Sequence, residues 1–304
     1  MKAAFVFSGQ GAQKVGMGKD IFDTISTAHE LFKKADKILG FSISDICFSG
    51  PDTKLTETKY CQPAIYVMSL ACLAAFNEKY PEIKPIAAAG LSLGELSALS
   101  AAGAFSFETG LKIIEKRAAF MQESCENTQG TMASIMKGEL SLIEETCLAN
   151  SVDVANINSA AQIVISGEKN KIAKTIAALK EKGITKVIAL NVAGAYHSRL
   201  MKPAEEKLSA YLKNINFNTP LIPVAQNYVG KLIKESSQLK NNVISQVTGS
   251  VRWIECVNSI ASLEVDTIIE FGPGTVLTGL IKRIKPEINT ININSLETLN
   301  AFKL

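Results

Sequence analysis

A serine flanked by two glycines is the first place in this sequence where covalent chemistry can be expected. Gly90-Leu91-Ser92-Leu93-Gly94 fits the G-x-S-x-G pattern, in which the serine lies on a sharp turn between a strand and a helix with its hydroxyl exposed. Glycine is needed on both sides because the turn is crowded and strained. The N-terminus of the following helix offers free N–H groups to a developing oxyanion. The alternative is a small-residue turn with an inert serine, because the bare pattern also arises by chance.

A serine nucleophile needs a base to take its proton, usually histidine, and the chain has only two histidines. His29 shares a helical face with Lys33 and Asp36, opposite the apolar stripe of its helix, which predicts a solvated side chain. His197 follows a predicted strand and the flexible pair Gly194-Ala195. His197 is therefore the candidate base, and a core or surface histidine is the alternative. Since no Asp or Glu lies at a recognisable triad position, a backbone carbonyl is expected to be the third partner.

The helix predicted from Phe107 to about Cys125 carries an arginine on its apolar side. At one turn per 3.6 residues its hydrophobic residues form one broad arc, and Arg117 points into the middle of that arc. Burying an unpaired guanidinium is costly, so Arg117 must meet an anion. That anion is either an internal Asp or Glu, or the carboxylate of a ligand, which a planar guanidinium holds through two parallel hydrogen bonds.

Strand, glycine loop and helix follow one another at both ends of the chain. The predicted strands are 3–7, 86–90 and 267–271. This repetition favours a parallel α/β sheet with helices on its faces. The loop after the first strand fails the dinucleotide-binding pattern because Lys14 stands where the third glycine is needed. We expect this loop to place a backbone N–H, that of Gln10, beside the nucleophile instead.

The middle of the chain follows a different order. The predicted elements are strand 131–136, helix 141–150, strands 152–158 and 162–166, helix 169–182 and strand 186–192. The order βαββαβ is typical of a ferredoxin-like unit. We therefore expect a large, discontinuous α/β domain of residues 1–125 and 196–304, with a small ferredoxin-like domain inserted at 126–195.

Composition limits the classes of function. The chain has 304 residues, of which 47% are hydrophobic and 20% charged, as in ordinary globular proteins. A net charge of +3 is too mild to indicate nucleic acid binding. The longest apolar stretch, 65–76, is too short to span a membrane, and no signal peptide is recognisable, so we expect a cytoplasmic protein. Six scattered cysteines without a C-x-x-C pair predict buried free thiols and argue against a metal site.

In the order and spacing of these motifs, the chain resembles the malonyl-CoA:acyl carrier protein transacylase family along nearly its whole length. The segments that carry the resemblance are Gly9–Gln13, Gly90–Glu95, Lys116-Arg117, Asn158-Ser159, Gln162–Gly167, Gly194–Ser198, Gln246–Thr248, Val251–Trp253, Phe271–Gly274 and Leu277–Leu280. The resemblance implies an α/β-hydrolase-like large domain with a ferredoxin-like insert. It also implies transfer of malonyl from malonyl-CoA to the phosphopantetheine thiol of acyl carrier protein, for fatty acid synthesis, without a metal or cofactor.

The resemblance further implies a catalytic role for each matching residue. Ser92 is acylated and His197 is its base. The backbone N–H groups of Gln10 and Leu93 form the oxyanion hole. The main-chain carbonyl of Gln246 orients His197, which fits the missing triad acid.

Substrate binding is implied in the same way. Arg117 holds the free malonyl carboxylate, and the other expected binding positions are Gln10, Leu91, Tyr196 and Asn158. The family usually has histidine directly before the nucleophile, where this chain has Leu91, so the acyl selectivity depends on an altered pocket edge. The aliphatic residue after the serine and the aromatic residue before His197 both fit malonyl rather than methylmalonyl.

Other functions use the same residues. A serine hydrolase or thioesterase could operate with the same serine and histidine. A trans-acting acyltransferase of a polyketide synthase, or one choosing another acyl group, is a second alternative. A non-catalytic scaffold on the same fold is a third.

Overall fold

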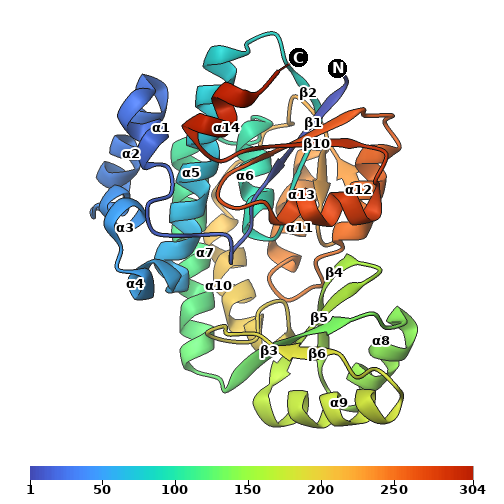
Figure 1. Cartoon of the computed structure of the whole chain (residues 1–304). Helices are drawn as coiled ribbons and strands as arrows, with labels where there is room; N and C mark the ends of the chain where they lie inside the picture. The colour runs from blue at the N-terminus through green and yellow to red at the C-terminus, as the bar shows by residue number, and fades with distance from the viewer. Residues whose placement is uncertain (304) are drawn as a thin grey trace.

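The computed structural model describes residues 1–303, which form two separate β-sheets surrounded by helices (Figure 1). The larger sheet has the strand order β10-β9-β1-β2-β7-β8. Its strands are β1 (Ala3–Phe7), β2 (Pro85–Gly90), β7 (Val224–Gln226), β8 (Lys231–Ile233), β9 (Thr267–Phe271) and β10 (Asn289–Ile293). Every neighbouring pair is parallel except β7 and β8. The predicted parallel sheet is therefore confirmed, with an antiparallel edge strand that the sequence patterns did not indicate.

Helices cover both faces of this sheet. The helices of the large part are α1 (Lys19–Thr24), α2 (Ser26–Leu39), α3 (Ile43–Ser49), α4 (Asp52–Thr56), α5 (Thr58–Lys79), α6 (Leu93–Ala101), α7 (Phe107–Glu126), the 3₁₀ turn η1 (Arg199–Met201), α10 (Lys202–Leu212), α11 (Ser236–Ser245), α12 (Trp253–Ala261), α13 (Val276–Ile284) and α14 (Leu296–Ala301). Alternate residues of β1 point to opposite faces. Phe5 and Phe7 join the core formed with α5, α6 and α7, whereas Ala4 and Val6 join the core under α12 and α13.

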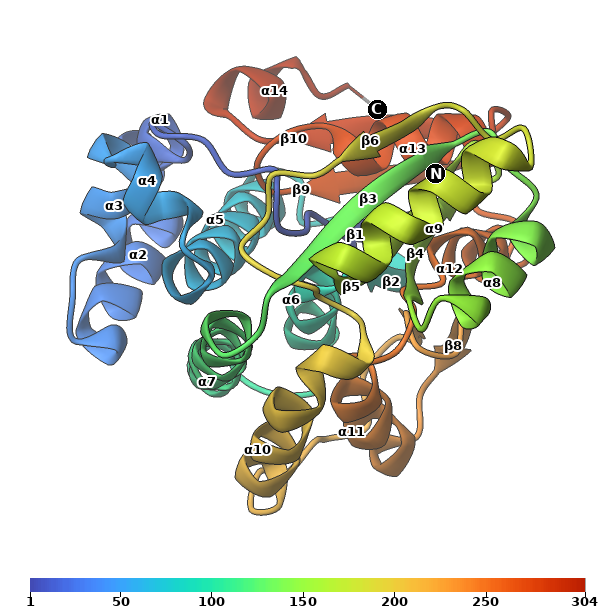
Figure 2. The same ribbon diagram turned by 90° about the horizontal axis from the view of Figure 1, so that it is seen from below.

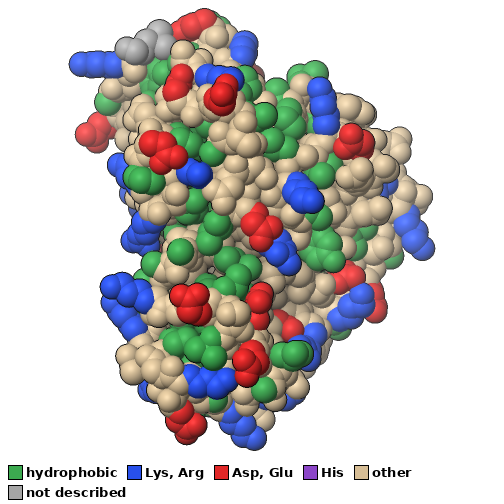
Figure 3. Space-filling view, turned by 90° about the vertical axis from the view of Figure 1, so that its right-hand side faces the viewer, with side chains coloured by type: hydrophobic (Ala, Val, Ile, Leu, Met, Phe, Trp, Pro, Cys, Tyr) green, Lys and Arg blue, Asp and Glu red, His purple; other side chains and the backbone are tan. Residues whose placement is uncertain are grey.

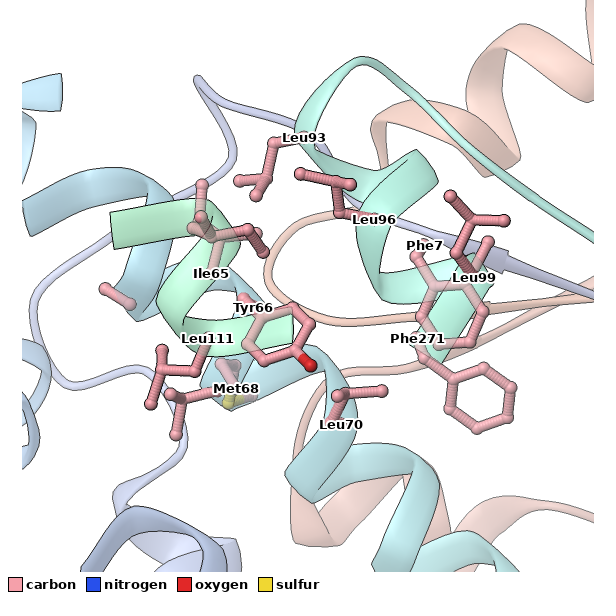
Figure 4. Packing of buried hydrophobic residues seen from close by; sticks show 14 of the residues in the cluster. Phe7, Ile65, Tyr66, Met68, Leu70, Leu93, Leu96, Leu99, Leu111 and Phe271 are labelled. Carbon is pink, nitrogen blue, oxygen red and sulfur yellow. The ribbon is translucent and has the colours of Figure 1, made fainter. Parts of the chain in front are cut away.

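The core around α6, the helix that follows Ser92, consists of closely packed apolar side chains. Figure 4 shows Leu93, Leu96 and Leu99 of α6 beside side chains of α5 and α7, with Phe7 and Phe271 from the ends of two strands nearby. All five side chains are essentially inaccessible to solvent. Burial of this kind is the main stabilising force of a domain, and it fixes the start of α6 relative to the sheet edge.

The smaller sheet is antiparallel, with the order β4-β5-β3-β6. Its elements are β3 (Gly130–Met136), α8 (Leu140–Ala149), β4 (Asp153–Ser159), β5 (Gln162–Glu168), α9 (Lys169–Glu181) and β6 (Val187–Ala189). Helices α8 and α9 pack on the same sheet face through a separate apolar cluster (Figure 2). The order βαββαβ and this strand arrangement are those of a ferredoxin-like unit, as the sequence predicts.

The last strand of this unit is shorter than the sequence suggests. The prediction of a strand over 186–192 is wrong beyond Ala189. The Val192 N–H donates to the Leu190 carbonyl at 3.1 Å, a tight local turn that ends the extended conformation. Only three residues pair with β3, and Ile188 is half exposed because β6 is an edge strand.

The outer strand of the small sheet, β4, is connected to the large part of the chain at Val251, in the segment before α12. The Ile157 N–H donates to the Val251 carbonyl at 2.9 Å, and the Val251 N–H donates to the Ala155 carbonyl at 2.8 Å. Arg199 and Asp153 add a two-pronged ion pair across the same boundary. We propose the division of the chain at 126 and 195 on the separate core of the small sheet.

Charged side chains are interspersed on the surface. The face in Figure 3 shows Lys and Arg among Asp and Glu, with apolar atoms between them. No helix in residues 1–303 is long and apolar enough to cross a membrane.

Candidate active site

Ser92 lies on the sharp turn between β2 and α6, with a backbone conformation that side chains rarely adopt (φ 52°, ψ −102°). Both flanking glycines are required by close packing. A Cβ on Gly90 would lie 2.0 Å from the carbonyl carbon of Gly94, and a Cβ on Gly94 would lie 2.1 Å from the Phe7 oxygen. The turn is therefore pressed against both its own helix and the end of β1. This geometry favours the exposed nucleophile turn over an inert small-residue turn.

The loop after β1 lies against this turn. A Cβ on Gly9 would come within 2.6 Å of the Leu91 oxygen, so only glycine lets the two backbones approach. In the described part of the chain, the backbone N–H groups of Gln10 and Leu93 have no acceptor. Leu93 is the first residue of α6, where an unpaired N–H is intrinsic to the helix end. Both predicted oxyanion donors are thus available on the two segments that meet at Ser92.

Ser92 and His197 are in direct contact. Ser92 Oγ lies 2.7 Å from His197 Nε2, and His197 Nδ1 lies 2.8 Å from the Gln246 carbonyl. A carbonyl only accepts, so Nδ1 carries the proton and the lone pair of Nε2 faces the serine hydroxyl. His197 also has a positive φ of 53°. A backbone carbonyl, that of Gln246, thus lies in the position expected of a third partner.

The imidazole of His197 is held in its neutral form. Burial, together with the nearby positive charge of Arg117, lowers the pKa of His197 to about 4. The side chain is 4% exposed, so little water is available to solvate an imidazolium ion. His29 is exposed and stacks on Phe22 with ring centroids 4.2 Å apart, away from the site, as its helical face predicts.

Arg117 is buried, with 1% of its surface exposed, and its guanidinium reaches the nucleophile. Nη2 donates to Ser92 Oγ at 3.0 Å and to Gln246 Oε1 at 2.9 Å, and Nη1 donates to Gln62 Oε1 at 2.7 Å. Nε has no partner. Among the described residues no Asp or Glu forms an ion pair with Arg117. Of the two anions expected from sequence, the internal carboxylate is therefore not in contact with it.

Charge around Arg117 is only partly compensated. Burial lowers the pKa of Arg117 to about 10, and the carboxyl of Glu95 acts in the opposite direction without touching the guanidinium. Glu95 is itself fully buried, and this burial raises its pKa to about 7. A guanidinium has five N–H donors, and here they meet only three neutral oxygens. The site is electrostatically prepared for an anion.

Gln246 contacts all three candidate residues, Ser92, His197 and Arg117. Its main-chain carbonyl accepts from His197, and its side-chain oxygen accepts from Arg117. Its Nε2 donates to the Ser92 carbonyl at 3.1 Å. The family resemblance implied a role only for the main-chain carbonyl of Gln246, and the structure adds the contacts of its side chain.

Three further residues of the site were missed by sequence reasoning. Gln62 is a buried amide in the largely apolar α5, a signal that a helical-wheel argument of the kind used for Arg117 could have found. Glu95 ends the segment Gly90–Glu95 that carries the resemblance, but the sequence did not indicate a function for it. Asn227 accepts the Ser92 N–H at 2.6 Å and had no recognisable signal, because it follows a strand of three residues.

The other predicted binding residues, Tyr196, Leu91 and Asn158, lie in different surroundings. Tyr196 is buried, and its hydroxyl lies 2.5 Å from Thr58 Oγ1 at the start of α5. Leu91 is half-buried against the core under α12 and α13. Asn158 lies on β4 of the small sheet, is 8% exposed, and has an unpaired Oδ1. The structure does not bring Asn158 into contact with Ser92 or Arg117.

The cysteines are separate from this chemistry. All six are buried and unpaired, as the sequence predicts. Burial raises the pKa of the Cys61 and Cys72 thiols to about 12, so neither is a thiolate at neutral pH.

Comparison with known proteins identifies relatives of the whole chain. Residues 4–294 match the family model of the acyl transferase domain. The malonyl CoA-acyl carrier protein transacylase of Bacillus subtilis is 38% identical over 98% of this chain and 95% of its own length. That of Haemophilus influenzae is 36% identical, over 99% and 98% respectively.

Solved structures agree with these relatives. The malonyl CoA-acyl carrier protein transacylase of Clostridium perfringens superposes with a TM-score of 0.94 at 36% identity, covering 99% of this chain and 96% of that one. A malonyl-transacylase solved in complex with a type II polyketide synthase acyl carrier protein gives 0.93 at 32% identity, covering 99% and 98%. The similarity thus extends over both sheets and over all the segments that form the candidate site.

We expect His197 to remain neutral from about pH 8 down to about pH 5 and to titrate near pH 4. Ring-proton NMR on a His29→Gln variant, in which His197 is the only histidine, measures this pKa directly. An added Arg117→Gln change is expected to raise the pKa, because it removes the repulsion between two cations. A value near the ordinary 6.5 in the His29→Gln protein would contradict the described environment.

Proposed function

We propose, from the premise that this chain belongs to the malonyl CoA-acyl carrier protein transacylase family, that Ser92 carries the malonyl group between coenzyme A and acyl carrier protein. One observation carries this proposal: Ser92 Oγ contacts both His197 Nε2 at 2.7 Å and Arg117 Nη2 at 3.0 Å. A malonyl ester needs a base to form it and a cation to hold its free carboxylate, and both meet at this one hydroxyl. The enzyme is an acyltransferase of fatty acid synthesis that acts on malonyl-CoA and acyl carrier protein.

In the first half-reaction, Ser92 attacks the thioester carbonyl of malonyl-CoA. His197 Nε2 takes the hydroxyl proton as the C–O bond forms, and the Gln246 carbonyl stabilises the resulting imidazolium through Nδ1. The backbone N–H groups of Gln10 and Leu93 receive the negative charge of the tetrahedral oxygen. Each such donor is worth about 3 kcal/mol of barrier. The C–S bond then breaks, and the coenzyme A thiolate leaves with the proton from His197.

In the second half-reaction, the phosphopantetheine thiol of acyl carrier protein attacks the Ser92 ester. His197 takes the thiol proton, the same two N–H groups hold the oxyanion, and the proton returns to Ser92 Oγ as the ester breaks. One base and one oxyanion hole thus serve both directions, since the two thioesters are chemically equivalent. No net charge or redox change remains in the site after a cycle.

Arg117 supplies the preference for a dicarboxylic acyl group. A malonyl carboxylate would fill the donors of Arg117 that no internal carboxylate contacts, and a buried charge-assisted pair of this kind is strong. It also offsets the positive charge that depresses the pKa of His197, so the base becomes stronger when the correct acyl group is bound. An acetyl group brings no such charge.

Two alternatives use the same side chains. A serine hydrolase would pass the acyl group to water. A polyketide pathway is the second alternative, and it is favoured by the similar malonyl-transacylase that was solved with a polyketide carrier protein. We propose a cytoplasmic location on the six buried free thiols, which suit a reducing compartment.

The transfer reaction can be tested by mixing the protein with malonyl-CoA and an acyl carrier protein bearing phosphopantetheine and weighing both proteins by intact-mass spectrometry. We expect malonyl on the enzyme first and on the carrier afterwards, with little free malonate. Ser92→Ala is expected to abolish both adducts, because no other group accepts the acyl chain. Free malonate as the main product would indicate a hydrolase, and an enzyme adduct surviving in Ser92→Ala would refute the nucleophile.

The role of Arg117 predicts a change in selectivity. In Arg117→Ala, the rate of Ser92 acylation by malonyl-CoA is expected to fall by about 10²-fold or more, because a buried charged contact is lost. Acylation by acetyl-CoA should change by less than about tenfold. Lys116→Ala is the matched control, since it removes a neighbouring, half-exposed cation of the same helix. Equal losses with both acyl donors would assign Arg117 a structural role.

A further inference from the structure

The conformation of Ser92 must be held in place by its surroundings. Its backbone lies outside the regions that residues with side chains prefer, so its conformation is strained. A strained residue persists only when neighbouring contacts determine it. The question is which contacts hold this turn in the form from which Oγ reaches His197.

One side-chain amide bridges the turn. Asn227 Oδ1 accepts the Ser92 N–H at 2.6 Å, and Asn227 Nδ2 donates to the Gly90 carbonyl at 2.9 Å. The two contacts lie on either side of Leu91, so they fix the peptide groups at which the chain reverses. Because the Ser92 N–H can only donate, it requires the oxygen of the amide, and the nitrogen is left for Gly90. Asn227 thus matches the turn in one orientation.

The fold explains why this residue is available. Asn227 directly follows β7, and β7 is the parallel neighbour of β2, which ends at Gly90. The carboxyl ends of parallel strands meet at the same sheet edge, where sites are usually formed in α/β folds. Asn227 is fully buried there, so neither of its amide atoms exchanges its partner with solvent.

A buried carboxyl group holds Asn227 in turn. The Asn227 backbone N–H donates to Glu95 Oε2 at 2.5 Å, and Gln226 Nε2 donates to Glu95 Oε1 at 3.2 Å. Glu95 belongs to the first turn of α6, three residues after Ser92. The contacts therefore close a ring from Ser92 through Asn227 and Glu95 back to Ser92 along the helix.

This ring of contacts also determines which backbone N–H groups remain free to bind the oxyanion. The Ser92 N–H is occupied by Asn227, whereas the Ser92 carbonyl is held by Gln246 Nε2 at 3.1 Å. The peptide that joins Ser92 to Leu93 is therefore fixed at its carbonyl, and its other end is the unpaired Leu93 N–H. A change at Asn227 would tilt both the nucleophile and this oxyanion donor.

We propose that Asn227 is a positioning residue for acyl transfer: its side-chain amide holds the strained Ser92 turn, and Glu95 in the first turn of α6 holds the Asn227 backbone N–H. The inference rests on the proposed function, because it assigns Ser92 as the acylated group. Nothing in it requires Asn227 to touch the substrate.

The test compares three variants in single-turnover acylation by malonyl-CoA, followed by intact-mass spectrometry. Asn227→Ala removes both contacts with the turn, and Asn227→Asp keeps an oxygen opposite the Ser92 N–H in a side chain of the same shape. Gln226→Ala is the matched control, because it deletes a neighbouring buried amide that contacts Glu95 but not the turn. Thermal melting of each variant establishes that the protein is folded at the assay temperature.

We expect Asn227→Ala to lower the maximal acylation rate by about 10²-fold, as misplacement of a reacting group by about 1 Å does. The malonyl-CoA concentration at half-maximal rate should change by less than about threefold, since Arg117 is untouched. Asn227→Asp should also slow acylation, by about tenfold or more, because its carboxylate cannot donate to the Gly90 carbonyl. Gln226→Ala should stay within about threefold of the unmodified protein in rate, even if it is equally destabilised.

Labelling of Ser92 by a fluorophosphonate is measured in parallel, because it needs the same turn and oxyanion donors but no malonyl-CoA. If the unmodified protein reacts with the fluorophosphonate but not with malonyl-CoA, the proposed function fails while the labelling rates still judge Asn227. If Asn227→Ala reacts at the rate of Gln226→Ala with both reagents, the positioning role is refuted. If Asn227→Ala does not fold, Asn227→Asp decides, and a rate equal to that of the unmodified protein with both reagents overturns the proposal.

Discussion

The constraint on which the site depends is a buried guanidinium that, among residues 1–303, has no carboxylate in contact. Arg117 lies at 1% exposure among apolar side chains of α7 and α5, and its partners are neutral oxygens of Gln62, Gln246 and Ser92. Neutral acceptors lower the cost of burying the charge without cancelling it. The guanidinium points at Ser92 Oγ, so in the proposed reaction the group that binds the substrate anion lies next to the group that reacts. An ion pair with an internal carboxylate would have compensated the buried charge of Arg117, but it would also have occupied the N–H donors that a ligand carboxylate needs.

The same charge sets the properties of the base. Burial and the proximity of Arg117 keep His197 neutral, and the Gln246 carbonyl fixes its tautomer, so Nε2 faces Ser92 as an acceptor. A base with so low a pKa is weak by itself. In the proposed reaction, a substrate carboxylate would offset the guanidinium charge and make the imidazole easier to protonate. Under this proposal, charge recognition and proton transfer are coupled through the 3.0 Å contact between Arg117 and Ser92.

Much of this arrangement could be predicted from the sequence, because it depends on local patterns. The strands 3–7 and 267–271 match the structure in full, and the order of elements in the small sheet was correct. Ser92 and His197 were found by motif and by elimination, and Arg117 by its position on a helical wheel. The resemblance to a known family then supplied Gln10, Leu93 and the Gln246 carbonyl.

The rest depends on contacts between segments far apart in the chain, which periodicity does not reveal. Asn227 follows a strand of three residues and meets Ser92 across 135 positions, so no local pattern indicates it. The side-chain contacts of Gln246 arise from the packing of a loop against the sheet edge. Asn158, implied by resemblance alone, lies on the small sheet without a contact to the dyad.

The most direct test of the account is a crystal structure of the malonyl–Ser92 acyl-enzyme. The account predicts that the free carboxylate of the malonyl group lies within hydrogen-bonding distance of the Arg117 guanidinium, in place of its contact with the Ser92 hydroxyl. A carboxylate directed to solvent, with Arg117 still bound only to Gln62 and Gln246, would contradict it.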